Sequence, residues 1–212
     1  MSVGCKQFGA DLSVRPFFFF MTLIALAFLL LTGTLDASQA GSSRSWLDRP
    51  LAGWNKAGAL VPATATPGES RDQILKRCGL ELRRATAADR ALADAGLIPM
   101  THLTRVLVRD DVEIVDGVVG MDEGCEPASF NTFVFVGGRF AGTLSPTAMA
   151  PRRDGAAGAI RIISADEITV DFLRYGPADT ECCPAAHVKA RFRINRTQTP
   201  PVVEPADLQT TR

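Results

Sequence analysis

The chain has 212 residues, of which 46% are hydrophobic and 22% are charged, and its 23 basic and 23 acidic residues balance to a formal net charge of zero. This length suits one domain with additional terminal segments. The neutral balance argues against nucleic acid as a partner, because binding to phosphates requires an excess of basic side chains. The length and composition therefore indicate a single globular domain. They do not indicate its function, which we seek in local features of the sequence.

The first 40 residues carry the features of a secretory signal. Residues 17–31 form an uncharged apolar run that follows Lys6 and Arg15, and small residues close it at positions 37–40. This order predicts a signal peptide, or an N-terminal membrane anchor if residues 32–35 extend the apolar run. In both cases the rest of the chain is expected outside the cytoplasm, secreted, periplasmic or in the cell envelope. Membrane contact is expected only through this segment, if it is not cleaved.

The remainder of the chain divides into three parts. Residues 41–69 are rich in Gly, Ala, Ser, Thr and Pro, which predicts a flexible spacer. Trp46 and Trp54 lie in this spacer, and we expect them to pack on the domain, with partner or membrane-interface contacts as the alternative. Residues 70–195 are predicted to form a single domain, and the polar, Pro-rich residues 196–212 a disordered tail.

The domain is predicted to begin with two short helices. The first covers residues 70–77, with Ser70 as its N-cap. The second covers residues 86–95, where Thr86 and Asp89 fit a capping box. Because a strand with one apolar face needs a cover, we expect these helices to pack on the sheet that follows.

The hydrophobic period changes to two after the second helix, which predicts strands. Two hairpins are expected, one across Gly137-Gly138 and one across residues 164–167. Glu167 and Asp171 are expected to meet basic residues of the last strand across the sheet. The fold class is therefore α+β, with an antiparallel, hairpin-built sheet of about six strands after two short N-terminal helices. The segments with strand periodicity are residues 103–109, 112–119, 131–136, 139–144, 159–163, 168–173 and 188–194.

The chain has five cysteines, and Cys5 is lost if the signal is cleaved. The other four are expected to form two disulfides in an oxidising compartment. A bond between the neighbours Cys182 and Cys183 would close a strained small ring, so we expect one of them to bond Cys78 and the other Cys125, in either arrangement. The spacing contains no Cys-x-x-Cys pair, which argues against zinc and against the usual redox motif.

We expect no enzymatic activity, cofactor or metal, because the residues of common catalytic motifs are missing. The histidines His102 and His187 come without a Gly-x-Ser-x-Gly nucleophile motif. The acidic residues between Asp110 and Glu126 lack the spacing of a calcium loop, so we interpret them as a solvated face and not as a calcium site or glycosidase pair. Residues 137–142 are Gly-rich but lie between strands, which excludes a phosphate loop.

Several motifs in the second half of the chain resemble the LppP/LprE lipoproteins, a group of small secreted bacterial proteins. Trp54-Asn55, Pro62 and Cys78 also resemble the N-terminal half of that group, so the resemblance covers most of residues 54–194. The motifs that carry it are residues 124–127, residues 131–146, Met149, residues 153–155, residues 172–175 and residues 182–184.

This resemblance implies an extracytoplasmic protein without an established activity. The chain departs from the group in one respect, because a lipoprotein carries a cysteine directly after its apolar run and none stands between Leu31 and Arg77. We therefore expect release or a retained N-terminal anchor in place of lipid attachment.

Three functions are consistent with these features. We expect first a non-enzymatic, extracytoplasmic structural or binding module for an unknown envelope component, with the hairpin at residues 131–144 and residues 151–155 as the first surfaces to test. The alternative is a thiol–disulfide redox protein that uses Cys182-Cys183, which predicts a reducible bond or free thiols there. The third is a hydrolase that uses the acidic residues between 110 and 126.

Overall fold

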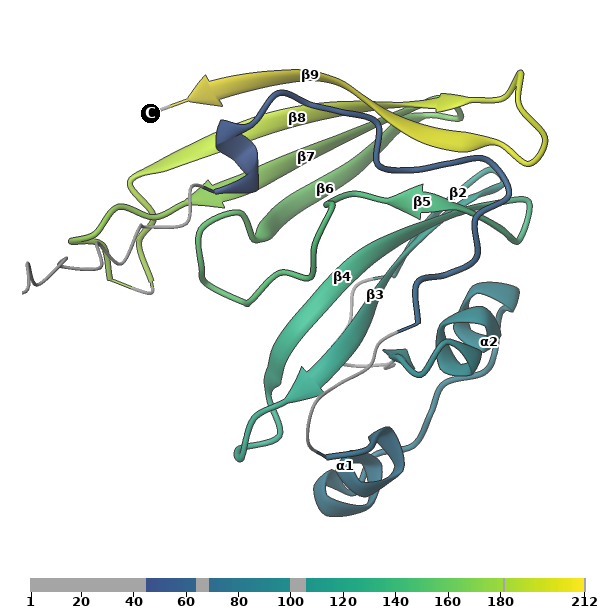
Figure 1. Ribbon diagram of the computed structural model, residues 1–212, viewed down its shortest axis with the longest axis vertical. Coiled ribbons are helices and arrows are strands. Elements are labelled where there is room, and N and C mark those ends of the chain that lie inside the picture. The colour runs from purple at the N-terminus through teal and green to yellow at the C-terminus, as the bar shows by residue number, and fades with distance from the viewer. Residues whose placement is uncertain (1–44, 64–68, 100–105, 181, 212) are drawn as a thin grey trace, which may run out of the picture. The chain divides into compact units, whose positions relative to one another are not determined.

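Two antiparallel sheets form the frame of the protein (Figure 1). This computed structural model describes residues 45–63, 69–99, 106–180 and 182–211. The predicted signal segment, residues 1–40, and the candidate base His102 lie outside the described residues. Within the described residues, no helix has the length and apolar character that a membrane crossing requires.

The first sheet has the strand order β1–β3–β4–β5, and β2 also pairs with β3. The hairpin of β4 and β5 turns at Gly137 and Gly138 as predicted, and their φ angles of 57° and 74° lie in the left-handed region that a tight hairpin turn requires. The strands are β1 (Ile98–Pro99), β2 (Val106–Arg109), β3 (Val112–Met121), β4 (Pro127–Val136) and β5 (Arg139–Thr143).

The second sheet contains four strands in chain order. The predicted hairpin of β6 and β7 is present, and β7 pairs with β8. The register places Asp171 opposite Lys189 and Glu167 opposite Arg193, as expected, while the ion pair of Asp171 is with Arg161 on β6 at 3.4 Å. The strands are β6 (Ala157–Ser164), β7 (Glu167–Arg174), β8 (Ala186–Asn195) and β9 (Val202–Thr211).

Strand β9 corrects the prediction of a disordered tail over residues 196–212. It pairs with β8, and Val202 and Val203 are buried. Pro205 hides the strand pattern in the sequence, but it lies beside a register shift, where a strand tolerates the missing N–H of proline. The domain therefore extends beyond residue 195.

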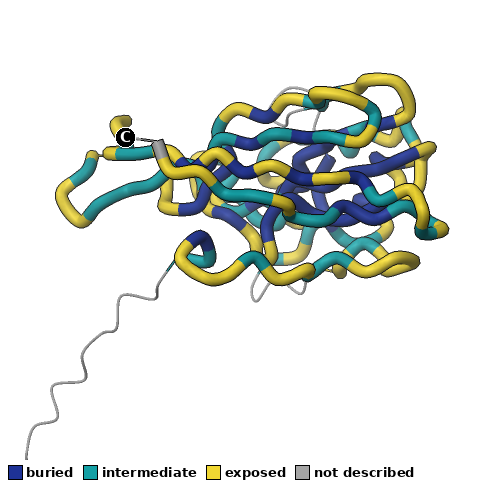
Figure 2. The backbone as a smooth tube through the Cα atoms, turned by 90° about the horizontal axis from the view of Figure 1, so that it is seen from above, coloured by how far each residue is buried: buried dark blue, intermediate teal, exposed yellow. Residues whose placement is uncertain are grey.

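The inner faces of the two sheets share one hydrophobic core. Ile114 and Val134 from the first sheet belong to the same buried cluster as Val170 and Phe192 from the second, and Figure 2 shows the buried stretches gathered in the interior of this domain. The predicted single sheet of about six strands is thus replaced by sheets of five and four strands, although the α+β class agrees with the structure. Alternation in sequence shows which residues share a face, but not which sheet a strand joins.

Both predicted helices are present as α1 (Arg71–Cys78) and α2 (Ala87–Asp94). Each begins with a capping box in which the side chain of Ser70 or Thr86 accepts a backbone N–H of its own first turn. The helix starts were readable in the sequence because these contacts are local.

Helix α2 covers the outer face of the first sheet, where Leu92 is buried with Val115 and Phe133. The helices therefore cover one sheet, as predicted, while no described helix packs on the outer face of the second. There, Lys189 and the candidate base His187 are exposed on β8. This face is a solvated surface.

Residues 45–63, the described part of the predicted flexible spacer over residues 41–69, correct that prediction because they pack on the domain. This segment contains a short 3-10 helix, η1 (Trp46–Asp48), and follows the edge of the sandwich (Figure 1). The ring of Trp46 lies 4.8 Å from that of Phe172, and Trp54 lies 6.2 Å from Phe192. The expected packing of both tryptophans on the domain is confirmed, because burial of their large rings stabilises the contact.

Candidate functional site

Two of the four predicted disulfide cysteines, Cys78 and Cys125, are bonded to each other. Cys78 ends α1 and Cys125 lies in the turn between β3 and β4, with an S–S distance of 2.07 Å and a Cα–Cα distance of 5.6 Å. The prediction that each of them bonds one of the neighbours Cys182 and Cys183 is therefore wrong. Sequence periodicity could not show that this turn lies beside the end of α1.

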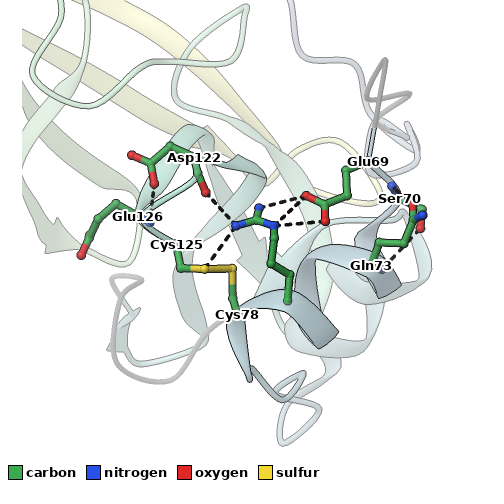
Figure 3. Close-up of polar contacts among 8 residues, drawn as sticks. Glu69, Ser70, Gln73, Cys78, Asp122, Cys125 and Glu126 are labelled. Atoms are coloured by element: carbon green, nitrogen blue, oxygen red, sulfur yellow. Dashed lines mark hydrogen bonds and ion pairs between the residues drawn. A yellow bond between two sulfur atoms is a disulfide. The ribbon is translucent and has the colours of Figure 1, made fainter. Parts of the chain in front are cut away.

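Arg77 forms hydrogen bonds that connect α1 with the disulfide and with the β3–β4 turn. Its guanidinium donates to both carboxylate oxygens of Glu69, to the carbonyl oxygen of Asp122 at 3.0 Å and to Cys125 Sγ at 3.3 Å. The hydrogen bond from Arg77 lowers the pKa of Glu69. Figure 3 shows Glu69 and Asp122 close to the disulfide of Cys78 and Cys125. The cluster explains how α1 is held, and we interpret it as structural.

Cys182 and Cys183 are bonded to each other in the loop between β7 and β8. This is the pairing that ring strain led us to reject. Both residues are exposed, so a partner in solution can reach them. The base of the loop is held by Asp179, whose carboxylate accepts the N–H of Gly176 at 2.7 Å and of Ala185 at 2.8 Å.

The acidic residues between Asp110 and Glu126, which we interpreted as a solvated face, are separated by the fold. Glu113 accepts the hydroxyl of Thr86 under α2 at 3.0 Å, whereas Asp116 faces the second sheet and accepts the hydroxyl of Thr132 at 2.6 Å. In the described part of the chain, no group of three or more His, Cys, Asp or Glu side chains is placed to hold a metal ion. The acidic residues of this run therefore lie at separate places in the fold and do not share one site.

Arg196 joins turns of the two sheets. It donates two hydrogen bonds of 2.8 Å to Asp111 in the β2–β3 turn and one of 2.6 Å to Asp166 in the β6–β7 turn. The hydrogen bonds from Arg196 lower the pKa of Asp111. We call this group the Arg196 clamp, and it holds one end of the sandwich together.

A pocket of ≈ 330 Å³ lies further along the same strands, between the two sheets. We call it the inter-sheet pocket. Figure 1 shows β3 and β4 running away from the second sheet toward their turn. Most of its wall is apolar, and its charged residues come from three different elements. The lining residues are Asp116, Val118, Glu126, Pro127, Phe130, Pro151, Arg152, Ala156, Ala157 and Leu173.

Glu126 and Arg152 bring opposite charges to this pocket without neutralising each other. Among the described residues, neither side chain forms an ion pair or a side-chain hydrogen bond. Arg174, the chain neighbour of the lining residue Leu173, instead pairs with Asp48 at 2.8 Å and Asp154 at 2.9 Å. Glu126 and Arg152 are thus available to a ligand, whereas Arg174 forms ion pairs that stabilise the fold.

The sequence contained only partial signals for this pocket. Glu126 belongs to the acidic run, and Arg152 belongs to residues 151–155, which we expected to be a binding surface. Their meeting depends on the packing of the two sheets, which no local pattern reports. A second pocket of ≈ 590 Å³ between α2 and residues 58–63 is mainly apolar, and its acidic residue Asp94 pairs with Arg84.

Residues 116–197 match the family model of the LppP/LprE lipoproteins. No curated protein and no solved structure matches the chain. The family match confirms the resemblance for the motifs between residues 124 and 184, whereas Trp54-Asn55, Pro62 and Cys78 lie outside it. It spans every described residue that lines the inter-sheet pocket, and also Cys182 and Cys183, but not Cys78.

Proposed function

We propose that this protein is a non-enzymatic binding module of the cell envelope and that its ligand site is the inter-sheet pocket. The observation that carries the proposal is the pair of unneutralised charges, Glu126 and Arg152, on a mostly apolar cavity of ≈ 330 Å³. Apolar pockets with a few polar groups of this kind are typical of small-molecule sites. The lipoprotein match and the apolar N-terminal run support a place in the envelope.

The chemistry of the lining supports binding without catalysis. The described residues of the pocket include no serine, cysteine, histidine or lysine, so nucleophiles and bases of these four types are missing there, and its carboxylates come only from Asp116 and Glu126. Asp116 is buried and already oriented by Thr132. These groups can position a ligand, and the rigid strands β3 and β7 fix the distance between the walls.

The binding site is tested with small-molecule probes and with a variant in which a larger side chain occupies the pocket. We would record backbone amide NMR spectra of the exported protein with acetate, methylammonium, isobutyramide and free amino acids. At least one probe is expected to shift resonances of the lining residues. The Ala157→Leu variant should lose this response, because Ala157 lines the pocket, while Ala159→Leu should keep it, because Ala159 is exposed on the same strand. A spectrum that no probe changes would contradict the proposal.

The location is tested separately by fractionating cells that express the full chain and sequencing the N-terminus of the product. A start near Gly41 in the medium or periplasm supports a cleaved signal. Retention of Met1 in the membrane fraction supports an anchor. A full-length product in the cytoplasm would contradict an envelope role.

The exposed bond between Cys182 and Cys183 favours a second candidate function, thiol–disulfide exchange. A dithiol reductant would open this bond and become oxidised itself, leaving two thiols on the loop. Alkylation and mass spectrometry should then find Cys182 and Cys183 modified before Cys78 and Cys125. Exchange with a model disulfide should be lost in the Cys182→Ser variant and kept when Cys78 and Cys125 are both replaced. Equal activity of the two variants would exclude this function.

A further inference from the structure

We infer that the inter-sheet pocket binds a small zwitterion, such as a free amino acid or a short peptide, with Arg152 holding the carboxylate and Glu126 the ammonium group. The inference rests on the proposed binding function and names its ligand class. It follows from three features of the pocket: a cationic rim, an anionic rim and an apolar wall between them.

The cationic rim is Arg152, in the connection between β5 and β6. Its backbone has a φ of 54°, in the left-handed region that residues other than glycine rarely adopt. Such conformations persist only where the surrounding structure imposes them, and they concentrate at functional positions. The guanidinium can donate two parallel hydrogen bonds to one carboxylate, which makes arginine a specific receptor for that group.

The anionic rim is Glu126, at the end of the β3–β4 turn. Its backbone is fixed because its N–H donates to the carboxylate of Asp122 at 2.9 Å and its carbonyl oxygen accepts the N–H of Asp122 at 3.0 Å. Figure 3 shows the Glu126 side chain pointing away from the disulfide of Cys78 and Cys125. Glu126 is exposed and lines the pocket, and its carboxylate suits an ammonium group.

The wall between the rims is apolar and small. Val118, Phe130 and Leu173 line it, from both sheets. A volume of ≈ 330 Å³ lies at the lower end of the range for ligand pockets, about 300–1,000 Å³, which favours an amino acid or dipeptide over a larger molecule. Asp116 also lines the pocket, where it is buried and accepts the hydroxyl of Thr132.

The experiment titrates the exported protein by calorimetry and NMR with glycine, L-leucine, L-phenylalanine and glycyl-glycine. For each ligand that binds, two derivatives are titrated as controls. The N-acetyl derivative lacks the ammonium group, and the C-terminal amide lacks the carboxylate. We expect both derivatives to bind at least tenfold more weakly than the zwitterion. Arg152→Gln should weaken the zwitterion but leave the amide unchanged, and Glu126→Gln should weaken the zwitterion but leave the N-acetyl form unchanged.

Matched controls are Arg193→Gln and Glu123→Gln, which alter exposed charges outside the pocket and should not change binding. If isobutyramide or acetate shifts the pocket resonances while no zwitterion binds better than its derivatives, the ligand class is wrong and the binding function stands. If no probe affects the pocket, both proposals fail. Equal losses in the control and pocket variants would also overturn the zwitterion assignment.

Discussion

The two ends of the sandwich use charge in opposite ways. At one end, Arg196 pairs with Asp111 and Asp166 and ties a turn of each sheet to the other. Further along the same strands, Glu126 and Arg152 line a cavity and stay unpaired among the described residues. Paired charges stabilise a fold modestly, whereas unpaired charges on an apolar pocket remain available for recognition. This difference separates structural charges from the candidate site.

The largest effect is expected from removing the bond that anchors the pocket end. Replacing Cys78 and Cys125 with serine frees a loop of 47 residues, and the chain-entropy model gives a loss of about 4 kcal/mol in the free energy of unfolding. Replacing Cys182 and Cys183 with serine should change it by no more than about 0.5 kcal/mol, because their bond closes no long loop. Urea unfolding of both double variants measures the contrast. Equal losses would contradict it.

The next largest loss of stability is expected at the edge formed by β5 and β9, where the side chain of Asn55 connects the two sheets. Its side-chain amide donates to the carbonyl oxygens of Thr143 and Val203, each at 2.9 Å, and the Thr143 N–H donates to its oxygen at 2.9 Å. A Cβ at Gly142 would lie 2.4 Å from Asn55 Cγ, and the φ of Gly142 is 141°. Gly142→Ala should therefore lower the free energy of unfolding by about 3 kcal/mol.

The control for this variant is Gly120→Ala, because a Cβ at Gly120 meets nothing within 4 Å. Its free energy of unfolding should change by less than about 1 kcal/mol. Thermal unfolding of both variants gives the comparison. A Gly142→Ala protein as stable as the Gly120→Ala protein would show that Asn55 does not hold this edge.

A smaller effect is expected from the Arg196 clamp. Arg196→Gln should cost about 1 kcal/mol at neutral pH, because the ion pairs are partly exposed. Since Arg196 lowers the pKa of Asp111, the stabilisation is present above the unfolded pKa of about 3.9 and is lost as the pH falls through the folded pKa. The stability difference between the wild type and the variant should therefore shrink toward pH 2. A difference that is constant with pH would contradict the ion pair.

The smallest effect should occur at the pocket. Glu126→Gln and Arg152→Gln each remove an unpaired charge, so the free energy of unfolding should change by no more than about 0.5 kcal/mol. Unfolding curves taken beside the Arg196→Gln variant give the direct comparison. A loss above 1 kcal/mol for either pocket variant, on the order of a structural ion pair, would assign that residue to the fold and weaken the case for a ligand site.

Local features of the sequence predicted the local features of the fold. The capping boxes at Ser70 and Thr86, the turn at Gly137-Gly138 and the pairing of Asp171 with the strand that carries Lys189 were all expected and are present. Each depends on contacts within a few residues or between strands joined by one connection. The conformational preferences of those residues therefore decide the outcome before the rest of the chain packs.

The sequence by itself determined the α+β class, the starts of the helices, two hairpins and the resemblance to the LppP/LprE lipoproteins. Only the tertiary structure decided that the strands form two sheets, that residues 202–211 form a strand, that Cys78 bonds Cys125, and that Glu126 and Arg152 meet at one pocket. These features join residues far apart in the chain. Their positions follow from the burial of one shared core, which periodicity reports for each strand alone and not for the way the strands assemble.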